Sequence, residues 1–347
     1  MKTFDYKKTS YNALLDEVRK CQGKMEFVRM SFPELLESLK DSAAFEEAYF
    51  STKIEGIILD YKGCKKLMDK LEQASSSHAG DVSDFVEQFR GYAKVLLTIN
   101  KRIDFFKVDT TSILAMFYAL FNIPADYKES VYRKVDYQDM IQDGKVVSVR
   151  VSPVESYETP LYIGSATTAL CEAFDEAPTF NIINIAKYMV DFMCIRPFDA
   201  GCGRVMRLFA YLLLLKSDID IVKYVSMSKI FEANASDYYE TMSLCCGGWD
   251  EDKNTYEPFI EFFLKCIIKA YNILFEQTKF KGGKKLKGAE RVFEYFKNNK
   301  CEVCKKDLQT ALPDISLSTI ENALHKLKSD GKIIQVGGGR STRYKIS

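Results

Sequence analysis

The sequence predicts a mainly α-helical protein with a β-hairpin in its middle and a small domain of helices and a second hairpin at its carboxy-terminal end. Apolar residues recur at three- and four-residue steps through residues 1–280, which is the period of amphipathic helices. Residues 131–151 depart from this period around Asp143 and Gly144, a hairpin turn signal. The glycine-rich basic stretch at residues 281–288 predicts a linker.

The helices of the first part are predicted to begin and end where the apolar period does. Leu35, Leu36 and Leu39 mark one of these helices, and Phe85 and Phe89 mark another. The predicted helices cover residues 10–21, 33–50, 60–73, 82–101, 109–121, 160–174, 180–194, 202–216, 228–245 and 256–278.

Three helices and a glycine-tipped hairpin are predicted after the linker. Their order is that of a winged helix-turn-helix, in which the third helix precedes the two strands of the wing. The helices are predicted at residues 289–298, 305–312 and 317–329, and the strands at residues 332–336 and 342–346.

Composition places the chain among ordinary soluble proteins. Its 347 residues are 47% hydrophobic, enough to bury the cores of two or three domains. The longest apolar run, Leu208–Leu215, is far shorter than the ~20 residues that span a bilayer, and no signal peptide precedes it. We therefore expect a cytoplasmic protein without a membrane partner. Ten scattered cysteines predict reduced thiols, and Cys301 and Cys304 lack the second pair that a zinc site needs, so no metal is predicted.

Charge divides the chain into two unequal parts. Residues 281–347 carry 15 Lys or Arg against 7 Asp or Glu, a net charge of +8, whereas the whole chain has +1 and the remainder therefore −7. The two parts are expected to meet different partners.

Residues 196–207 have the outline of a phosphate cradle. They read Arg-Pro-Phe-Asp-Ala-Gly-Cys-Gly-Arg-Val-Met-Arg and enter a predicted helix. Gly201 and Gly203 allow backbone N–H groups to turn inward, and a helix amino terminus attracts anions. Arg204 and Arg207 are three residues apart and therefore share a helical face, so both could reach the same phosphates.

This segment resembles the signature of the Fic family, His-Pro-Phe-x-Asp/Glu-Gly-Asn-Gly-Arg-x-x-Arg. Residues 226–239 are similar to a family segment that closes over the nucleotide base. The resemblance implies a nucleotide partner, ATP, and transfer of its AMP to a protein hydroxyl. The implied nucleotide-binding residues are Phe198, Gly201, Cys202, Gly203, Arg204, Arg207, Asn234, Tyr238 and Tyr239. Simple helical packing is the alternative role of the two tyrosines.

The resemblance also implies the domain organisation. The hairpin at residues 131–151 would be the family's flap, which holds a segment of the target protein by strand addition, although a hairpin without a binding role is the alternative. A homodimer is compatible with the sequence. The implied parts are an amino-terminal helical region at residues 1–105, a Fic-like core at residues 106–280, the linker at residues 281–288 and a winged helix at residues 289–347.

Three departures from the signature predict impaired chemistry. Arg196 stands where the family histidine removes a proton from the attacking hydroxyl, and a guanidinium has no acceptor. Arg196 is therefore expected to act as a third cation and not as a base. Ala200 replaces the carboxylate that holds Mg²⁺, so Mg²⁺ is not expected unless Asp199 takes over, and Cys202 replaces the asparagine.

The prediction is a degenerate Fic protein that keeps a phosphate pocket. Loss of the base alone typically costs about 10²- to 10⁴-fold in rate. Two alternatives stay open at this point. Cys202 could be a nucleophile, because a thiol at a helix amino terminus beside arginines has a lowered pKa. The chain could also be an active transferase of AMP, or of another phosphate-containing group, to protein hydroxyls.

A second family pattern lies upstream, at Ser51-Thr-Lys-Ile-Glu55-Gly56. It matches the inhibitory motif Ser/Thr-x-x-x-Glu-Gly/Asn at Ser51 and Glu55. The resemblance implies that Glu55 pairs with Arg207 and excludes the productive position of the γ-phosphate. The alternative is a solvated carboxylate at a helix end.

The basic carboxy-terminal part is expected to bind DNA. The third helix of a winged helix enters the major groove, and the wing contacts phosphates. A protein-docking module is the alternative for the same fold. The implied contacts are Ser318, Thr319, Asn322 and Lys326 on the helix, with Arg340, Arg343 and Lys345 on the wing.

Overall fold

The computed structural model shows two compact units, residues 1–60 with 64–282 and residues 61–63 with 283–347. The predicted turn Asp143–Gly144, residues 281–287 of the predicted linker, Cys301 and Arg340 lie outside the described residues. The structure describes residues 11–71, 85–124, 126–134, 136, 141–142, 145–146, 154–279, 288–298, 302–312, 315–339 and 342–346.

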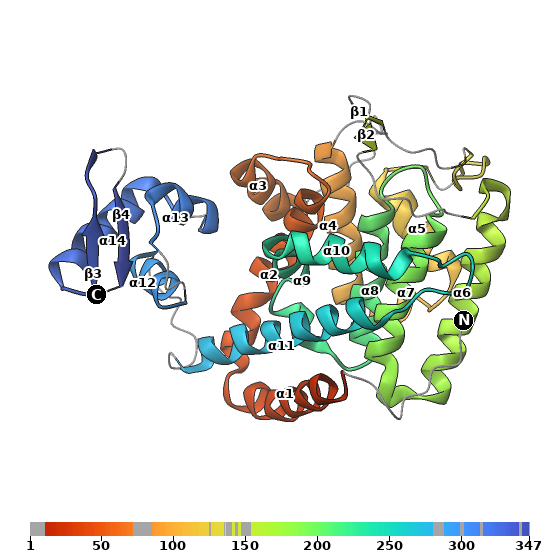
Figure 1. The fold of residues 1–347 in the computed structure, drawn as a ribbon, viewed down its shortest axis with the longest axis horizontal. Helices are drawn as coiled ribbons and strands as arrows, with labels where there is room; N and C mark the ends of the chain where they lie inside the picture. Colours follow the sequence, from red (N-terminus) through yellow and green to blue (C-terminus); the bar gives the residue numbers. More distant parts are fainter. Residues whose placement is uncertain are drawn as a thin grey trace. The chain divides into compact units, whose positions relative to one another are not determined.

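The first unit is built of helices around a central pair, α7 and α8, which Figure 1 shows among the other helices of the unit. Both are apolar on nearly every face, which is the pattern of helices buried on all sides. The α-helices of this unit, which includes α3 only from Cys64 on, are α1 (Asn12–Ser31), α2 (Pro33–Ile54), α3 (Tyr61–Leu71), α4 (Phe85–Lys101), α5 (Thr110–Leu120), α6 (Thr159–Glu176), α7 (Asn181–Ile195), α8 (Cys202–Lys216), α9 (Met227–Ala233), α10 (Ala235–Cys246) and α11 (Glu257–Lys279).

Short 3₁₀ turns connect several of these helices. The turns are η1 (Ile103–Phe105), η2 (Ser156–Glu158), η3 (Pro178–Phe180) and η4 (Asp220–Lys223).

None of the described helices combines the length and the apolar character that spanning a bilayer requires.

The structure corrects three predicted helix boundaries. The first helix, predicted at residues 10–21, continues to Ser31 because Met25 and Val28 extend its buried face. The second, predicted at residues 33–50, reaches Ile54, so Ser51 lies on its last turn and Glu55 caps its end. The helix predicted at residues 228–245 is broken into α9 and α10. Asn234 leaves helical geometry there, with φ −127° and ψ 39°.

The hairpin predicted within residues 131–151 is confirmed. Strands β1 (Ile141–Gln142) and β2 (Lys145–Val146) pair antiparallel, with Ile141 opposite Val146 and Gln142 opposite Lys145. The strand pair lies between α5 and α6 in the chain, and residues 154–158 lead from it into α6. Among its described residues, the helical unit therefore carries one short β-element, which precedes the signature segment in the chain.

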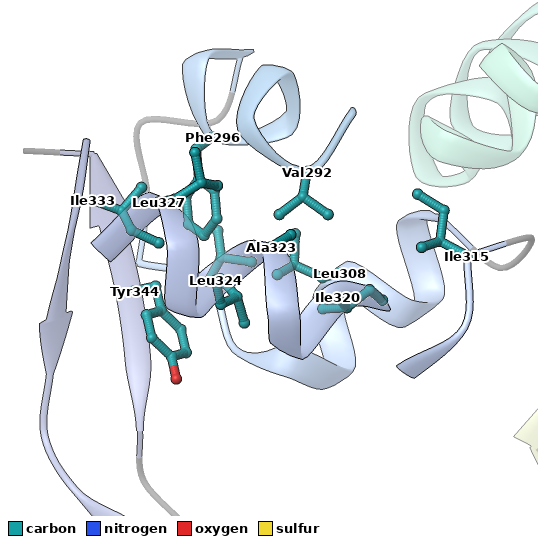
Figure 2. Close-up of a cluster of buried hydrophobic side chains, with 11 residues drawn as sticks. Val292, Phe296, Leu308, Ile315, Ile320, Ala323, Leu324, Leu327, Ile333 and Tyr344 are labelled. Carbon is teal, nitrogen blue, oxygen red and sulfur yellow. The ribbon is translucent and has the colours of Figure 1, made fainter. Parts of the chain in front are cut away.

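The second unit has the predicted order of three helices and a hairpin. Helices α12 (Gly288–Asn298), α13 (Lys305–Ala311) and α14 (Leu317–Ser329) precede strands β3 (Ile333–Val336) and β4 (Arg343–Ile346), which pair antiparallel. Figure 2 shows the apolar core that joins these elements. Its buried members are Val292, Phe296, Val303, Leu308, Ile315, Ile320, Ala323, Leu324, Leu327, Ile333 and Tyr344.

Candidate functional site

The signature segment connects the two central helices, and its backbone is left-handed at both ends. Arg196 closes α7 with φ 45° and ψ 68°, and its N–H donates to the carbonyl of Phe192 at 2.9 Å. Gly201 precedes α8 with φ 72°. A β-carbon on Gly201 would lie 2.9 Å from the ring of Phe121, so both the backbone conformation and the close packing require glycine. The segment thus enters α8 by a tight turn.

Phe198 anchors the segment in the core. Its buried ring stacks on Phe117 with a centroid distance of 4.0 Å and lies 6.1 Å from the ring of Tyr132. Phe198, which the sequence predicts to bind nucleotide, therefore packs against other aromatic rings in the core. Its role in this structure is to hold the signature segment in place.

Cys202 closes the segment on itself. Its thiol donates to the carbonyl of Phe198 at 3.1 Å and accepts the N–H of the same residue at 3.4 Å. Burial raises the pKa of Cys202 to about 11, against smaller lowering effects of the Phe198 N–H and Arg196. The lowered pKa that a nucleophilic role would need is thus not found. The thiol is a structural donor.

The arginines of the signature converge on one carboxylate. Arg204 donates from Nε to Oε2 of Glu55 at 2.8 Å, and Arg207 donates from Nη2 to Oε1 at 2.9 Å. Both arginines are 3% exposed, whereas the side chain of Glu55 is 22% exposed. The sequence prediction paired Glu55 with Arg207 alone. Placement on both guanidiniums makes Glu55 the counter-ion of the whole cradle.

Further donors of the two arginines are also engaged. Ser51 accepts from Arg207 twice, through its hydroxyl at 2.8 Å and its carbonyl at 2.7 Å. Gln88 on α4 accepts from Arg204. The last turn of α2 and its cap residue therefore supply three acceptors to Arg207, two from Ser51 and one from Glu55. The sequence alone indicates no role for Gln88, because a single glutamine in an amphipathic helix carries no distinguishing signal.

Gly203 makes room for the carboxylate. A β-carbon there would lie 2.8 Å from Oε1 of Glu55 and 3.0 Å from Nη1 of Arg207. Gly203 is the second residue of α8, so the carboxylate lies at the amino terminus of that helix. Helix dipole, arginine charge and the missing side chain all favour an anion at this point.

The helix that carries Glu55 is fixed by a buried acid that the sequence analysis missed. Glu47 accepts from the hydroxyl of Ser226 at 2.8 Å, from the N–H of Ser228 at 2.9 Å and from the hydroxyl of Ser228. Its side chain is only 2% exposed. The sequence signal that could have indicated this contact is the pair Ser226 and Ser228 at the start of a helix, together with Glu47 on an otherwise apolar helix face. These bonds join α2 to α9.

The three residues predicted to close over a base lie at different places. Tyr238 is buried and accepts from Nη1 of Arg207 at 3.4 Å. Tyr239 is 50% exposed and donates to the carbonyl of Ile54 at 2.6 Å, beside Glu55. Asn234 donates from its amide to the carbonyl of Ile230 at 2.6 Å. Burial raises the pKa of both tyrosines, so their hydroxyls stay neutral.

The segment offers poor ligands to a divalent cation. Ala200 has no oxygen on its side chain, and Asp199 beside it is exposed. Within the part of the chain that the structure describes, no group of three or more His, Cys, Asp or Glu side chains could hold a metal ion. The donor set therefore does not fit Mg²⁺.

In the second unit, α14 presents polar side chains on its exposed face. Ser316 caps the helix by accepting the N–H of Thr319 at 3.2 Å. The wing cations are partly engaged within the unit, because Arg343 donates to the carbonyl of Glu302 at 3.4 Å and Lys345 lies 3.7 Å from its carboxylate. The predicted contact residues Ser318, Asn322 and Lys326 are exposed, and Thr319 is half-buried.

The sequence matches no protein-family model and no curated protein. Solved structures of Fic proteins are nevertheless similar in fold. One is a Fic family protein from Desulfovibrio desulfuricans G20, with 16% identity over 100% of this chain and 98% of that chain and a TM-score of 0.59. A Fic domain containing signaling protein from Bacteroides thetaiotaomicron has 18% identity over 77% of this chain and 100% of that chain, with a TM-score of 0.58.

A fragment of Fic-1 from C. elegans is also similar, with 16% identity over 78% of this chain and 73% of that chain and a TM-score of 0.55. At these identities the likeness concerns the fold. The chain therefore has the fold of Fic proteins, a helical core that carries a β-hairpin.

Proposed function

We propose that this chain is a Fic-family protein with a nucleotide-phosphate pocket that Glu55 holds closed and a reaction centre that no longer supports ordinary AMP transfer. The observation that carries the proposal is the carboxylate of Glu55 beside Gly203, bonded to Arg204 and Arg207. A site that binds one anion through two buried guanidiniums and a helix amino terminus suits a phosphate equally well. ATP is the ligand that the fold implies.

The cradle residues would hold the phosphates of ATP once Glu55 is displaced. Arg204 and Arg207 supply the charge, and the N–H groups at the start of α8 supply further donors. Arg196 would add a third cation to the segment. The protein contributes binding and orientation there, without the carboxylate that would hold a metal.

The acceptor side of the reaction lacks its base. A hydroxyl that attacks a phosphate must lose its proton, and the position that would take this proton carries the guanidinium of Arg196. Nucleotide binding without turnover is the expected outcome. The chain then acts as a nucleotide-responsive regulator, with the winged helix as its DNA-binding part and a protein segment at the hairpin as a further partner.

Labelling with ATP tests the chemical half of this proposal. Purified protein is incubated with labelled ATP and Mg²⁺ and examined for AMP on itself and on added cell proteins. Three forms are compared: the unaltered chain, Glu55→Gly, and the set Arg196→His, Ala200→Asp and Cys202→Asn on the Glu55→Gly background.

The unaltered chain and Glu55→Gly are expected to label nothing, and the combined set to gain activity. Robust labelling by the unaltered chain would establish the competing function, an active transferase, and would overturn the proposal. A reverted set that binds ATP but stays inactive would show that more than these three positions has changed.

A further inference from the structure

Arg133 is a buried arginine, 5% exposed, that precedes β1 in the chain. It belongs to the root of the hairpin, which comprises Arg133 and Asp136 before β1 and Val154 and Ser156 after β2. Its backbone N–H donates to the carbonyl of Pro197 at 2.9 Å, and its Nε donates to the carbonyl of Arg196 at 2.9 Å. One residue thus satisfies two consecutive carbonyls of the signature segment.

The same guanidinium reaches the other end of the hairpin. Nη2 of Arg133 donates to the carbonyl of Val154, where the chain leaves the hairpin. Asp136 lies 3.6 Å from Nη1 of Arg133 and accepts the N–H of Ser156 at 2.7 Å, which is a second link between the two ends of the hairpin. Among the described residues, Arg133 therefore links both ends of the hairpin to the signature segment through hydrogen bonds.

The bond to Arg196 bears on an unfavourable backbone. Arg196 is a non-glycine residue in the left-handed region, a conformation that costs free energy and persists where its surroundings hold it. The Phe192 carbonyl holds the N–H of Arg196, and Arg133 holds its carbonyl. Both peptide groups that flank the strained residue are thereby fixed.

We propose that Arg133 is a positioning residue, which holds Arg196 in its left-handed conformation and couples the root of the hairpin to the anion cradle. This rests on the proposed function where it concerns ATP. The arginine touches no reacting atom and acts through the backbone of the segment. A protein segment that shifts the hairpin root would move the start of the cradle with it.

Hydrogen exchange of the signature segment tests the coupling without any ligand. Arg133→Met removes the forked donor but keeps much of its apolar bulk. Arg133→Lys keeps one cationic donor. Asp136→Asn is the matched control, because it weakens the closure of the root without touching the bonds to Arg196 and Pro197. The exchange of the amides of Arg196, Phe198 and Val205 is followed by mass spectrometry.

Arg133→Met is expected to speed exchange of these amides roughly ten- to a hundredfold, the effect of losing a charge-assisted hydrogen bond to a buried carbonyl. Arg133→Lys should restore part of this protection, and Asp136→Asn, which keeps both bonds to the segment, should change it far less than Arg133→Met. Equal exchange in all forms, or faster exchange spread evenly over the whole first unit, would overturn the proposal. Should Arg133→Met fail to fold, the comparison of Arg133→Lys with Asp136→Asn decides.

ATP affinity supplies a second readout on the Glu55→Gly background. Arg133→Met is expected to weaken ATP binding about tenfold, with partial rescue by lysine and a much smaller effect of Asp136→Asn. Unchanged affinity for ATP in Arg133→Met, next to measurable binding in its parent, contradicts the coupling. If no form binds ATP, the proposed function fails, and the exchange experiment still decides the role of Arg133.

Discussion

The Oε1 atom of Glu55 occupies the space that a side chain at Gly203 would fill. A β-carbon on Gly203 would lie 2.8 Å from that oxygen, although Glu55 follows the end of α2 and Gly203 lies in α8. The relationship ties the acid that caps the carboxy-terminal end of α2 to the amino terminus of α8. It makes both residues parts of one anion site.

Gly203→Ala is expected to destabilise the protein by about 1–3 kcal/mol, because the added methyl group forces Glu55 or Arg207 to move. On the Glu55→Gly background the same change should cost less, since one of its two neighbours is gone. Denaturant unfolding of the unaltered chain, the two single variants and the double variant gives the coupling free energy between Gly203 and Glu55. Gly164→Ala in α6 is the control, because its β-carbon would meet nothing within 4 Å. Additive costs of Gly203→Ala and Glu55→Gly would contradict the contact.

Glu55→Gly is expected to lower the free energy of unfolding by about 2–4 kcal/mol, because it leaves two buried guanidiniums without their counter-ion. The partial exposure of Glu55 places the expected cost below that of a wholly buried pair. Added pyrophosphate should restore the lost stability. Thermal unfolding with and without pyrophosphate measures both effects.

Glu232→Gln is the matched control for Glu55→Gly. Glu232 on α9 pairs at 2.7 Å with Lys53, which lies near the end of α2, but neither group is buried in the cradle. Its loss is expected to cost less than about 1 kcal/mol and to confer no response to pyrophosphate. A response equal to that of Glu55→Gly would show that the anion acts elsewhere.

Glu47→Ala is expected to cost about 3–5 kcal/mol, because it leaves the donors of Ser226 and Ser228 buried without an acceptor. Glu46→Ala is the control. Its carboxylate pairs with Lys229 at 2.6 Å near the surface, and its loss is expected to cost less than about 1 kcal/mol. Equal stability of the two variants would refute the anchoring of α2 by Glu47.

Asp191 on α7 predicts a pH dependence of stability. Burial raises the pKa of this carboxyl above its ordinary value, although Tyr256 and Trp249 donate hydrogen bonds at 2.6 and 2.8 Å that act in the opposite direction, as does the charge of Lys187. The fold thus favours the neutral acid. Its contribution to stability is fully present below the pKa of the unfolded chain and is lost as pH rises through the raised pKa of the folded state.

Asp191→Asn should abolish this loss, since the amide oxygen still accepts both bonds and no charge is buried. The variant is therefore expected to be more stable than the unaltered chain above that window and to approach it at lower pH. The fluorescence of Trp249, the single tryptophan, reports unfolding across the pH range. The exposed Asp237→Asn is the control. A variant that keeps the pH dependence of the unaltered chain would rule out Asp191 as its source.

Replacement of Arg343 and Lys345 by alanine should weaken duplex DNA binding and reduce its salt dependence. Each lost phosphate contact is expected to lower the slope of log K against log salt by about 0.9. Titration of labelled duplexes at several salt concentrations measures this slope. The exposed Lys265→Ala on α11 is the control. Retention that is insensitive to salt would favour a protein-docking role for the second unit.

Much of the helical fold could be predicted from the apolar period, because burial on one helix face imposes that period directly on the sequence. The break at Asn234 could not. An asparagine tolerates helical geometry, and its departure depends on a bond to the carbonyl of Ile230. The end of the first helix was also missed, because Gly23 weakens the local signal while Met25 and Val28 continue the buried face.

The candidate site was predictable to the extent that short motifs place charges at fixed spacing. Arg204 and Arg207 had to share a face of α8, and Glu55 was a natural counter-ion. The double attachment of Glu55, the acceptors on Gln88 and the buried Glu47 arise from tertiary packing between helices far apart in the chain. Burial of Cys202 likewise reversed the direction expected for its pKa, because a helix amino terminus alone does not say how much solvent remains.

Calorimetric titration of ATP into Glu55→Gly and into the unaltered chain tests the closed cradle most directly. Removal of the carboxylate is expected to tighten ATP binding at least about tenfold, and Arg207→Ala on the same background should abolish the gain. Equal ATP affinities of the unaltered chain and Glu55→Gly would contradict a pocket that Glu55 holds closed.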